Sequence, residues 1–128
     1  MSTPLATVAT DRAPAAVGPY SQAIIAGELV FVSGQIPLDP ATGQLVEGDF
    51  AAQVEQVLRN LDAVLTAAGC ERRQVAKVTV YLTDLGRFAE MNAVYERFFG
   101  DHRPARAAVE VSALPRGAAV EMEAVAVR

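Results

Sequence analysis

The run DFAAQVEQVLRNLDAVLTAAG, residues 49–69, has the spacing of one amphipathic helix. Its apolar side chains recur at intervals of three and four residues, which places them along one side of a helix. They are Phe50, Val54, Val57, Leu58, Leu61, Val64, Leu65 and Ala68. Asp49 is suited to cap the first turn, and Gly69 is suited to end the helix in a left-handed conformation. We therefore expect a helix that is buried along a single stripe.

The segments around this helix predict strands and a second helix. In residues 75–82 apolar side chains alternate with more polar ones, which is typical of a half-buried strand. A second helix is expected over about 85–99, ended by Gly100, and its inward side chains would be Phe88, Met91, Val94 or Tyr95, and Phe98. Further strands are expected at 5–8, 20–25, 29–33, 105–112 and 118–127. The second and third of these would form a hairpin through Ala26-Gly27-Glu28.

This order of elements predicts an α+β fold in one domain spanning residues 1–128. The two helices would pack on one face of a single mixed sheet. Residues 29–32 are apolar at successive positions, so we expect both faces of that strand to be covered. A homotrimer closed around a central barrel would cover the second face.

The composition excludes several classes of protein. Hydrophobic residues make up 52% of the 128 and charged residues 20%, so the chain is not disordered. The net charge is −4 and the 11 Lys and Arg are scattered, which argues against nucleic acid as a partner. One cysteine allows no internal disulfide, and one cysteine with one histidine cannot form a usual zinc site. We find no apolar stretch of membrane-spanning length and no secretory leader pattern, so we expect a cytoplasmic protein without a membrane partner.

Arg106 stands among small and apolar neighbours in the run PARAAV, residues 104–109. Its planar guanidinium matches a carboxylate with two parallel hydrogen bonds, and small neighbours leave space for a pocket. Alternatively, Arg106 reaches water from an edge strand or pairs with Glu110. The local sequence favours neither interpretation.

Glu121 and Glu123 share one face of an otherwise apolar strand. A carboxylate in a partly dry pocket has a raised pKa and can act as a general base, although both residues can equally well face solvent. His102 is interpreted as an exposed loop residue. Cys70 is interpreted as a packing residue, because the C-terminal end of a helix does not lower the pKa of a thiol.

Five short runs have the order and spacing of the RidA/YjgF family, and this resemblance extends from about residue 13 to residue 128. They are GPYSQ (18–22), SGQIP (33–37), NAVY (92–95), PAR (104–106) and VEMEAVA (120–126). The resemblance implies a chorismate-mutase-like fold and a homotrimer with active sites in the clefts between subunits. It also implies hydrolysis of 2-iminobutanoate and 2-iminopropanoate to 2-oxo acids and ammonia without a cofactor, which protects pyridoxal-phosphate enzymes.

The same resemblance gives roles to individual residues. Arg106 is similar to the family's carboxylate-binding arginine, and Glu121 to the glutamate that positions the hydrolytic water. The residues that resemble the substrate-binding wall are Tyr20, Ser33, Gly34, Phe88 and Asn92. Many bacterial members carry a cysteine two positions after the arginine. This chain has Ala108 there, and the resemblance implies that its main chain meets the substrate.

Two functions of other classes stay open from the sequence. One is a regulatory module that binds a small carboxylate without turnover, and the other is a translation inhibitor that acts on RNA. The acidic charge argues against the second. Chorismate mutase shares the architecture, but its ligand would need further cationic residues for a second carboxylate, and the sequence places none.

Overall fold

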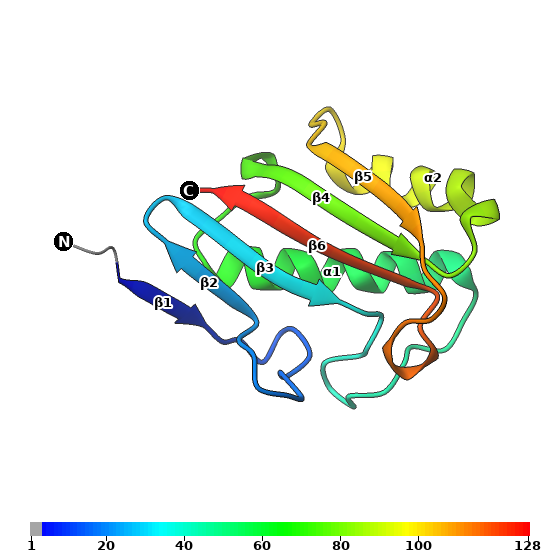
Figure 1. Cartoon of the computed structure of the whole chain (residues 1–128), viewed down its shortest axis with the longest axis horizontal. Helices are drawn as coiled ribbons and strands as arrows, with labels where there is room; N and C mark the ends of the chain where they lie inside the picture. The colour runs from blue at the N-terminus through cyan, green and yellow to red at the C-terminus, as the bar shows by residue number, and fades with distance from the viewer. Residues whose placement is uncertain (1–3) are drawn as a thin grey trace.

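Six strands form one mixed sheet in the computed structural model, which describes residues 4–128 (Figure 1). They are β1 (Leu5–Val8), β2 (Ala23–Ala26), β3 (Leu29–Gln35), β4 (Val75–Leu82), β5 (Ala105–Glu110) and β6 (Val120–Val127). Their order across the sheet is β1-β2-β3-β6-β4-β5. Neighbouring strands are antiparallel except β4 and β5, which are parallel. Residues 1–3 of the expected domain lie outside the described residues.

Both helices, α1 (Phe50–Ala67) and α2 (Phe88–Phe99), lie behind the sheet in Figure 1 and leave its other face open. The apolar stripe of α1 is buried against β3 and β6, as its spacing predicts. Asp49 caps the helix, with its carboxylate accepting a hydrogen bond from the Ala52 N–H at 3.0 Å. Gly69 follows the helix with φ +81°, in the left-handed region that favours glycine. The α+β fold with two helices on one face is thereby confirmed.

The second helix begins later than the sequence predicts, and it ends at Phe99, before Gly100, as predicted. Residues 85–87 form a 3₁₀ turn, in which Asp84 accepts a hydrogen bond from the Gly86 N–H, and α2 begins at Phe88. Phe88 is 37% exposed, and Phe98 packs against the edge of the core while Phe99 is buried. The prediction of an inward side chain is therefore wrong for Phe88, whereas Phe98 does pack against the core. Phe88 lies in the first turn, beyond the edge of the core.

Three strands are shorter than the sequence predicts, and the simplest case is β5, which ends at Glu110 rather than at residue 112. Residues 20–22 precede β2 in a loop, because the Gln22 side chain binds the backbone of residues 10–14 in place of a strand partner. At the other end of the chain β6 begins at Val120 rather than 118, because Pro115–Gly117 form a 3₁₀ turn that holds the preceding segment away from the sheet. The hairpin between β2 and β3 is confirmed, with Gly27 at φ +61°.

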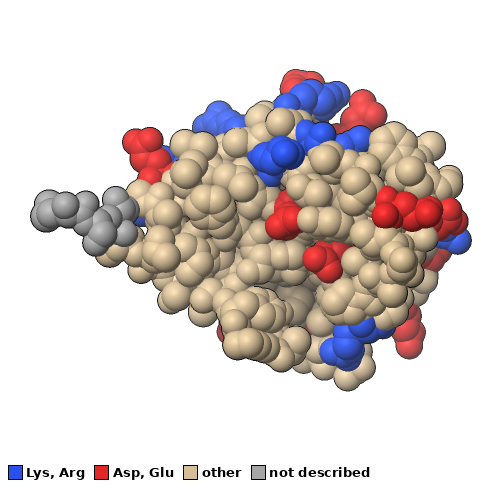
Figure 2. Space-filling view, in the orientation of Figure 1, with Lys and Arg blue, Asp and Glu red and all other residues tan. Residues whose placement is uncertain are grey.

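The open face of the sheet is largely apolar in the single chain. In β3, Val30 and Val32 are buried, whereas Leu29 and Phe31 are 42% and 44% exposed. Within a single chain, only one face of β3 is therefore covered, whereas the sequence predicts that both are covered. Figure 2 shows this face with few charged atoms, among them acidic atoms near its centre and basic atoms mainly toward its margin.

Candidate functional site

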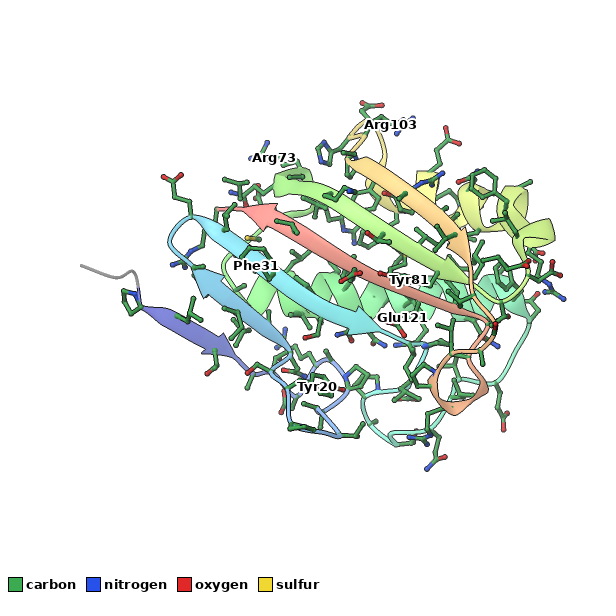
Figure 3. All side chains as sticks on the ribbon, in the orientation of Figure 1. Tyr20, Phe31, Arg73, Tyr81, Arg103 and Glu121 are labelled. Atoms are coloured by element: carbon green, nitrogen blue, oxygen red, sulfur yellow. The ribbon has the colours of Figure 1, made fainter. Side chains whose placement is uncertain are left out.

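One cavity, of about 470 Å³, opens where β3 ends and β6 begins. We call it the Glu121 cavity. Its polar side chains are those of Tyr20, Gln22, Ser33, Gln35, Arg116 and Glu121, and Gly34 also lines it. Figure 3 shows Glu121 near the end of β3 and Tyr20 in the loop before β2. Four residues predicted for substrate contact or catalysis from distant parts of the sequence therefore meet here.

A bulge in β3 makes room for the Glu121 carboxylate. The pairing of β3 with β6 shifts register between Val32 and Gln35, so Ser33 and Gly34 leave the regular ladder. A Cβ atom at Gly34 would overlap the Glu121 carboxylate. Glycine at this position permits the close approach of that side chain, which a Cβ atom would displace.

The remaining wall of this cavity is held by hydrogen bonds to the loop before β2. The Ser33 hydroxyl donates to the Ser21 carbonyl, which fixes the loop that carries Tyr20. Tyr20 is 50% exposed, and its hydroxyl oxygen accepts a long hydrogen bond of 3.4 Å from the Val17 N–H. The phenol therefore remains available to a ligand.

Glu121 is half-buried on the open face. Burial raises the pKa of its carboxyl group, and the nearby charge of Glu123 raises it further. Glu123 accepts a hydrogen bond from the Tyr81 hydroxyl, and this bond raises the pKa of Tyr81. The ion pairs among residues 4–128 do not include Glu121. A carboxylate in this state is a better proton acceptor than one paired with a cation.

Arg106 lies at the edge strand β5, on the face that packs against α2. Its Nη1 donates to the Asn92 Oδ1 at 2.7 Å. Its Cζ lies 5.4 Å from the ring centre of Phe88 and 4.8 Å from that of Tyr95. Arg106 lines a second cavity, of about 380 Å³, with Asn92, Tyr95, Glu96, Arg103 and Pro104, and we call it the Arg106 cavity. The carboxylate of Glu96 pairs there with Arg103, at 3.6 Å. The contacts of Arg106 hold its guanidinium in one orientation and occupy few of its five donors.

The alternative partner for Arg106 is occupied elsewhere. Glu110 accepts a hydrogen bond from the Leu85 N–H at 2.8 Å, and the ion pairs of residues 4–128 do not include Arg106. Ala108 lies on the same strand, half-buried against the core. A half-buried guanidinium without a carboxylate partner has the chemistry of an anion-binding site.

Tyr95 belongs to the Arg106 cavity, although sequence reasoning treated it only as a core residue. Its side chain is 7% exposed, and its hydroxyl has no hydrogen-bond partner within the described part of the chain. Burial raises the pKa of this phenol, and the charge of Arg106 acts in the opposite direction. The spacing from Asn92, three residues along α2, was the signal that both side chains share a helix face.

The two cavities lie on opposite sides of the sheet. Arg106 is paired in register with Val78, whose side chain is buried under the helices. Glu121 is paired with Tyr81, on the open face. The chain thus gathers Tyr20, Ser33, Gly34 and Glu121 in one place and Phe88, Asn92 and Arg106 in another. A single chain does not bring the two groups together.

Two further residues have structural roles. His102 is half-buried and its Nε2 lies 2.7 Å from the Val75 carbonyl, so the prediction of an exposed loop residue was wrong. Cys70 is buried and burial raises its pKa, which confirms it as a packing residue. Within residues 4–128 no cluster of three or more potential metal ligands is present. No helix in that range has the length and hydropathy of a membrane span.

Comparisons with known proteins give the same picture over nearly the whole chain. The family model described as endoribonuclease L-PSP matches residues 10–128. A RutC family protein of Pyrococcus abyssi is 54% identical over 117 residues, which are 91% of this chain and 92% of that protein. The 2-iminobutanoate/2-iminopropanoate deaminase of Bos taurus is 48% identical over 121 residues, which are 94% of this chain and 88% of that protein.

A solved structure agrees with the fold as well. RidA from the Antarctic bacterium Psychrobacter sp. superposes with a TM-score of 0.92 at 48% identity, covering 96% of this chain and 99% of that one. An identity of 48% over 96% of the chain indicates a common family and not only a common fold. The chain therefore belongs to the RidA/YjgF family, whose family model bears the description endoribonuclease L-PSP.

Proposed function

We propose that the chain hydrolyses reactive 2-imino acids, such as 2-iminobutanoate and 2-iminopropanoate, to 2-oxo acids and ammonia. The observation that carries this proposal is Arg106, which Asn92 and two aromatic rings hold in place and which forms no ion pair among residues 4–128. The raised pKa of Glu121 supports a base for the attacking water. The deaminase of Bos taurus supplies the substrate class. Such an activity would protect pyridoxal-phosphate enzymes in the cytoplasm.

We propose further that the active site forms between copies of the chain. Arg106 and Glu121 cannot act on one small substrate from opposite faces of the same sheet. If one copy supplies the Arg106 cavity and its neighbour the Glu121 cavity, the two groups meet across an interface. The exposed apolar side chains of Leu29, Phe31 and Val127 support self-association through the open face. A homotrimer around a central barrel satisfies both requirements.

The reaction needs positioning more than it needs a strong catalyst. A protonated imine is already electrophilic at carbon, so the chemistry calls for no cofactor. Arg106 would bind the substrate carboxylate with two parallel hydrogen bonds and fix the C=N carbon beside the water. Glu121 would accept a proton as the water oxygen bonds to that carbon. Return of this proton to the nitrogen of the resulting carbinolamine makes the nitrogen a leaving group. The C–N bond then breaks as the hydroxyl group loses its proton and becomes the carbonyl of the 2-oxo acid, and the departing ammonia takes up that proton.

The substrate wall would come from residues already in place. Tyr20 and Ser33 offer hydroxyl groups beside Glu121, and Gly34 lets the carboxylate approach the backbone. On the arginine side, Asn92 orients the guanidinium, Phe88 covers it, and the main chain at Ala108 lies two residues along the same strand.

A mixing experiment tests the activity and the shared site together. Arg106→Ala and Glu121→Ala are each assayed in a coupled reaction in which threonine dehydratase supplies the imine. The two variants are then unfolded and refolded together in equal amounts. In a ring with one site per interface, about one quarter of the sites regain both groups, because each interface draws its two sides independently. We expect activity to rise above the mean of the two separate variants, to at least about a quarter of the wild-type rate.

The possible outcomes separate the two parts of the proposal. No acceleration of imine hydrolysis by the wild-type chain would overturn the deaminase assignment. An active wild type whose mixed variants show only the mean of the separate variants would retain the activity and reject the site shared between copies. Wild-type binding of a 2-oxo acid without turnover would instead favour the regulatory module.

The RNA-directed activity that the family description names has less support in this chain. The net charge is −4, and the acidic Glu121 and Glu123 lie on the open face. A phosphate backbone is repelled by such a surface. An RNA affinity tighter than micromolar that weakens with added salt would reverse this interpretation.

A further inference from the structure

Arg116 is the cation of the Glu121 cavity. Among the residues that line this cavity, Arg116 and Glu121 are the charged ones. The ion pairs of the described chain, residues 4–128, involve neither of them. The cavity therefore presents a positive and a negative group that do not neutralise each other.

The backbone at Arg116 is unusual for a residue with a side chain. Its φ of +62° and ψ of 14° lie in the left-handed region, and it is the sole non-glycine with positive φ in the described range 4–128. For an L-residue this conformation is strained relative to glycine. Pro115 before it and Gly117 after it, at φ +75°, hold the turn. The turn thus projects a guanidinium at a position that glycine would occupy with less strain.

One hydrogen bond sets the direction of this side chain. The Nη2 of Arg116 donates to the Gly43 carbonyl at 3.2 Å, which links the Pro115–Gly117 turn to the loop before α1. A guanidinium has five N–H donors, so most of them stay available. The side chain is exposed and can meet a ligand without first losing a buried partner.

The Glu121 cavity is larger than a four-carbon imino acid requires. Its volume of about 470 Å³ falls within the range of roughly 300–1,000 Å³ that holds drug-sized ligands. Val17, Ile36 and Leu38 supply an apolar wall suited to methylene groups. Because the proposed function assigns the α-carboxylate to Arg106 of another copy, Arg116 is left for the far end of the substrate.

We propose that Arg116 binds a second carboxylate, so that the chain accepts dicarboxylic 2-imino acids such as those derived from aspartate and glutamate. This inference rests on the proposed function for the position of the first carboxylate. Arg116 would be the second cationic residue that a doubly charged ligand needs and that the sequence alone did not identify. The substrate range then extends from short aliphatic imines to those with a carboxylate one or two methylene groups beyond the reacting carbon.

Binding of stable 2-oxo acids tests this without depending on turnover. Calorimetry would compare 2-oxobutanoate with 2-oxoglutarate for the full chain, for Arg116→Gly and for Arg73→Ala. Glycine keeps the left-handed turn, so the variant removes the guanidinium without adding strain. Arg73 is exposed and pairs with Glu71 away from the cavity, so its variant makes the same change in net charge. Thermal unfolding of each variant shows whether the fold is retained.

We expect Arg116→Gly to weaken 2-oxoglutarate binding about tenfold, the size of one charge-assisted contact, and 2-oxobutanoate binding less than about twofold. Arg73→Ala should change neither. The inference is overturned if both acids weaken equally, or if the wild type binds 2-oxobutanoate and not 2-oxoglutarate. Hydrolysis of imines generated from glutamate by an amino-acid oxidase is measured in parallel. If the wild-type chain hydrolyses none of the imines, the proposed reaction is rejected. If 2-oxoglutarate binding nevertheless depends on Arg116, the second carboxylate site is retained.

Discussion

The Arg106 cavity and the Glu121 cavity differ in how their charged groups are held. Arg106 is fixed by Asn92 and by the rings of Phe88 and Tyr95. Glu121 lies over a glycine in a cavity with a largely apolar wall, and burial raises its pKa. The Arg106 cavity therefore contains a cation held in one orientation, and the Glu121 cavity contains a carboxyl group with a raised pKa.

This difference shows why the two groups benefit from lying apart in the single chain. A guanidinium in ion-pair contact with Glu121, which Arg116 in the same cavity does not make, would lower the pKa of the carboxyl group and would itself be neutralised. Separation by the sheet leaves each group free until two copies and a substrate meet. The substrate carboxylate would then occupy Arg106, so that Glu121 keeps its basicity.

Loss of Arg106 should have the largest effect on this arrangement. For Arg106→Ala we expect kcat/KM for imine hydrolysis to fall by about 10²–10³, the equivalent of roughly 3–4 kcal/mol of transition-state stabilisation. Arg106→Lys should recover only part of this loss, because an ammonium cannot form the two parallel hydrogen bonds. Initial rates in the threonine dehydratase assay measure both, with Arg73→Ala as the matched control. Near wild-type rates for Arg106→Ala would exclude the Arg106 cavity as the carboxylate site.

A methyl group at Gly34 should impair the other cavity by a smaller factor. A Cβ at Gly34 would displace the Glu121 carboxylate, so we expect Gly34→Ala to lower kcat about tenfold. Gly18→Ala is the control, because a Cβ there meets only the Tyr20 ring at an ordinary 3.5 Å. Thermal unfolding of both variants separates displacement from misfolding. An unchanged rate for Gly34→Ala would mean that the position of Glu121 does not matter.

Most of the fold could be predicted from the sequence because its helices and strands obey simple periodicities. The α1 stripe and the alternation in β4 follow from residue spacing alone. The first residues of α2 and β6 were missed because local side-chain contacts determine them. Asp84 caps a 3₁₀ turn before α2, and Pro115 with Gly117 maintains another before β6.

The candidate site was predictable as a set of residues but not as an arrangement. The face on which Arg106 lies depends on the register of β5 against β4, a long-range pairing that no local pattern encodes. Tyr95 and Arg116 were missed for a similar reason. The first looks like a core residue until the Arg106 guanidinium is placed above it, and the second reaches its cavity through an unexpected left-handed turn.

The raised pKa of Glu121 predicts an effect of pH on both rate and stability. The rate should rise with pH as Glu121 ionises, at a pH above the ordinary carboxyl value of about 4.3. In the folded state the carboxyl group holds its proton more tightly than in the unfolded state. Its contribution to the free energy of unfolding is therefore full below the unfolded pKa and is lost as pH rises through the folded pKa.

Glu121→Gln tests this sign because it removes the titration. We expect the variant to lose the rising limb of the rate profile and a few-fold to tenfold in rate. Its free energy of unfolding, relative to wild type, should increase as pH rises from about 4 toward neutrality. Urea denaturation across that range gives the comparison, with Glu90→Gln as an exposed control on α2. A relative stability that falls with rising pH would show that Glu121 is stabilised as a carboxylate.

The smallest expected effect concerns the buried hydroxyl of Tyr95. This hydroxyl has no hydrogen-bond partner among the described residues, so on folding it loses its bonds to water and gains none in return. Tyr95→Phe removes that desolvation cost and keeps the aromatic ring beside Arg106. We expect the free energy of unfolding to rise by about 1 kcal/mol, while the affinity for 2-oxobutanoate changes less than threefold. Urea denaturation and calorimetry on the same preparation measure the two quantities. Tyr81→Phe is the control: it removes a hydroxyl that donates a hydrogen bond to Glu123, so it should lower the free energy of unfolding. Greater stability combined with a tenfold loss of affinity would show that the Tyr95 hydroxyl forms a hydrogen bond with the ligand. The Arg106 cavity would then bind its anion through this hydroxyl as well as through the guanidinium.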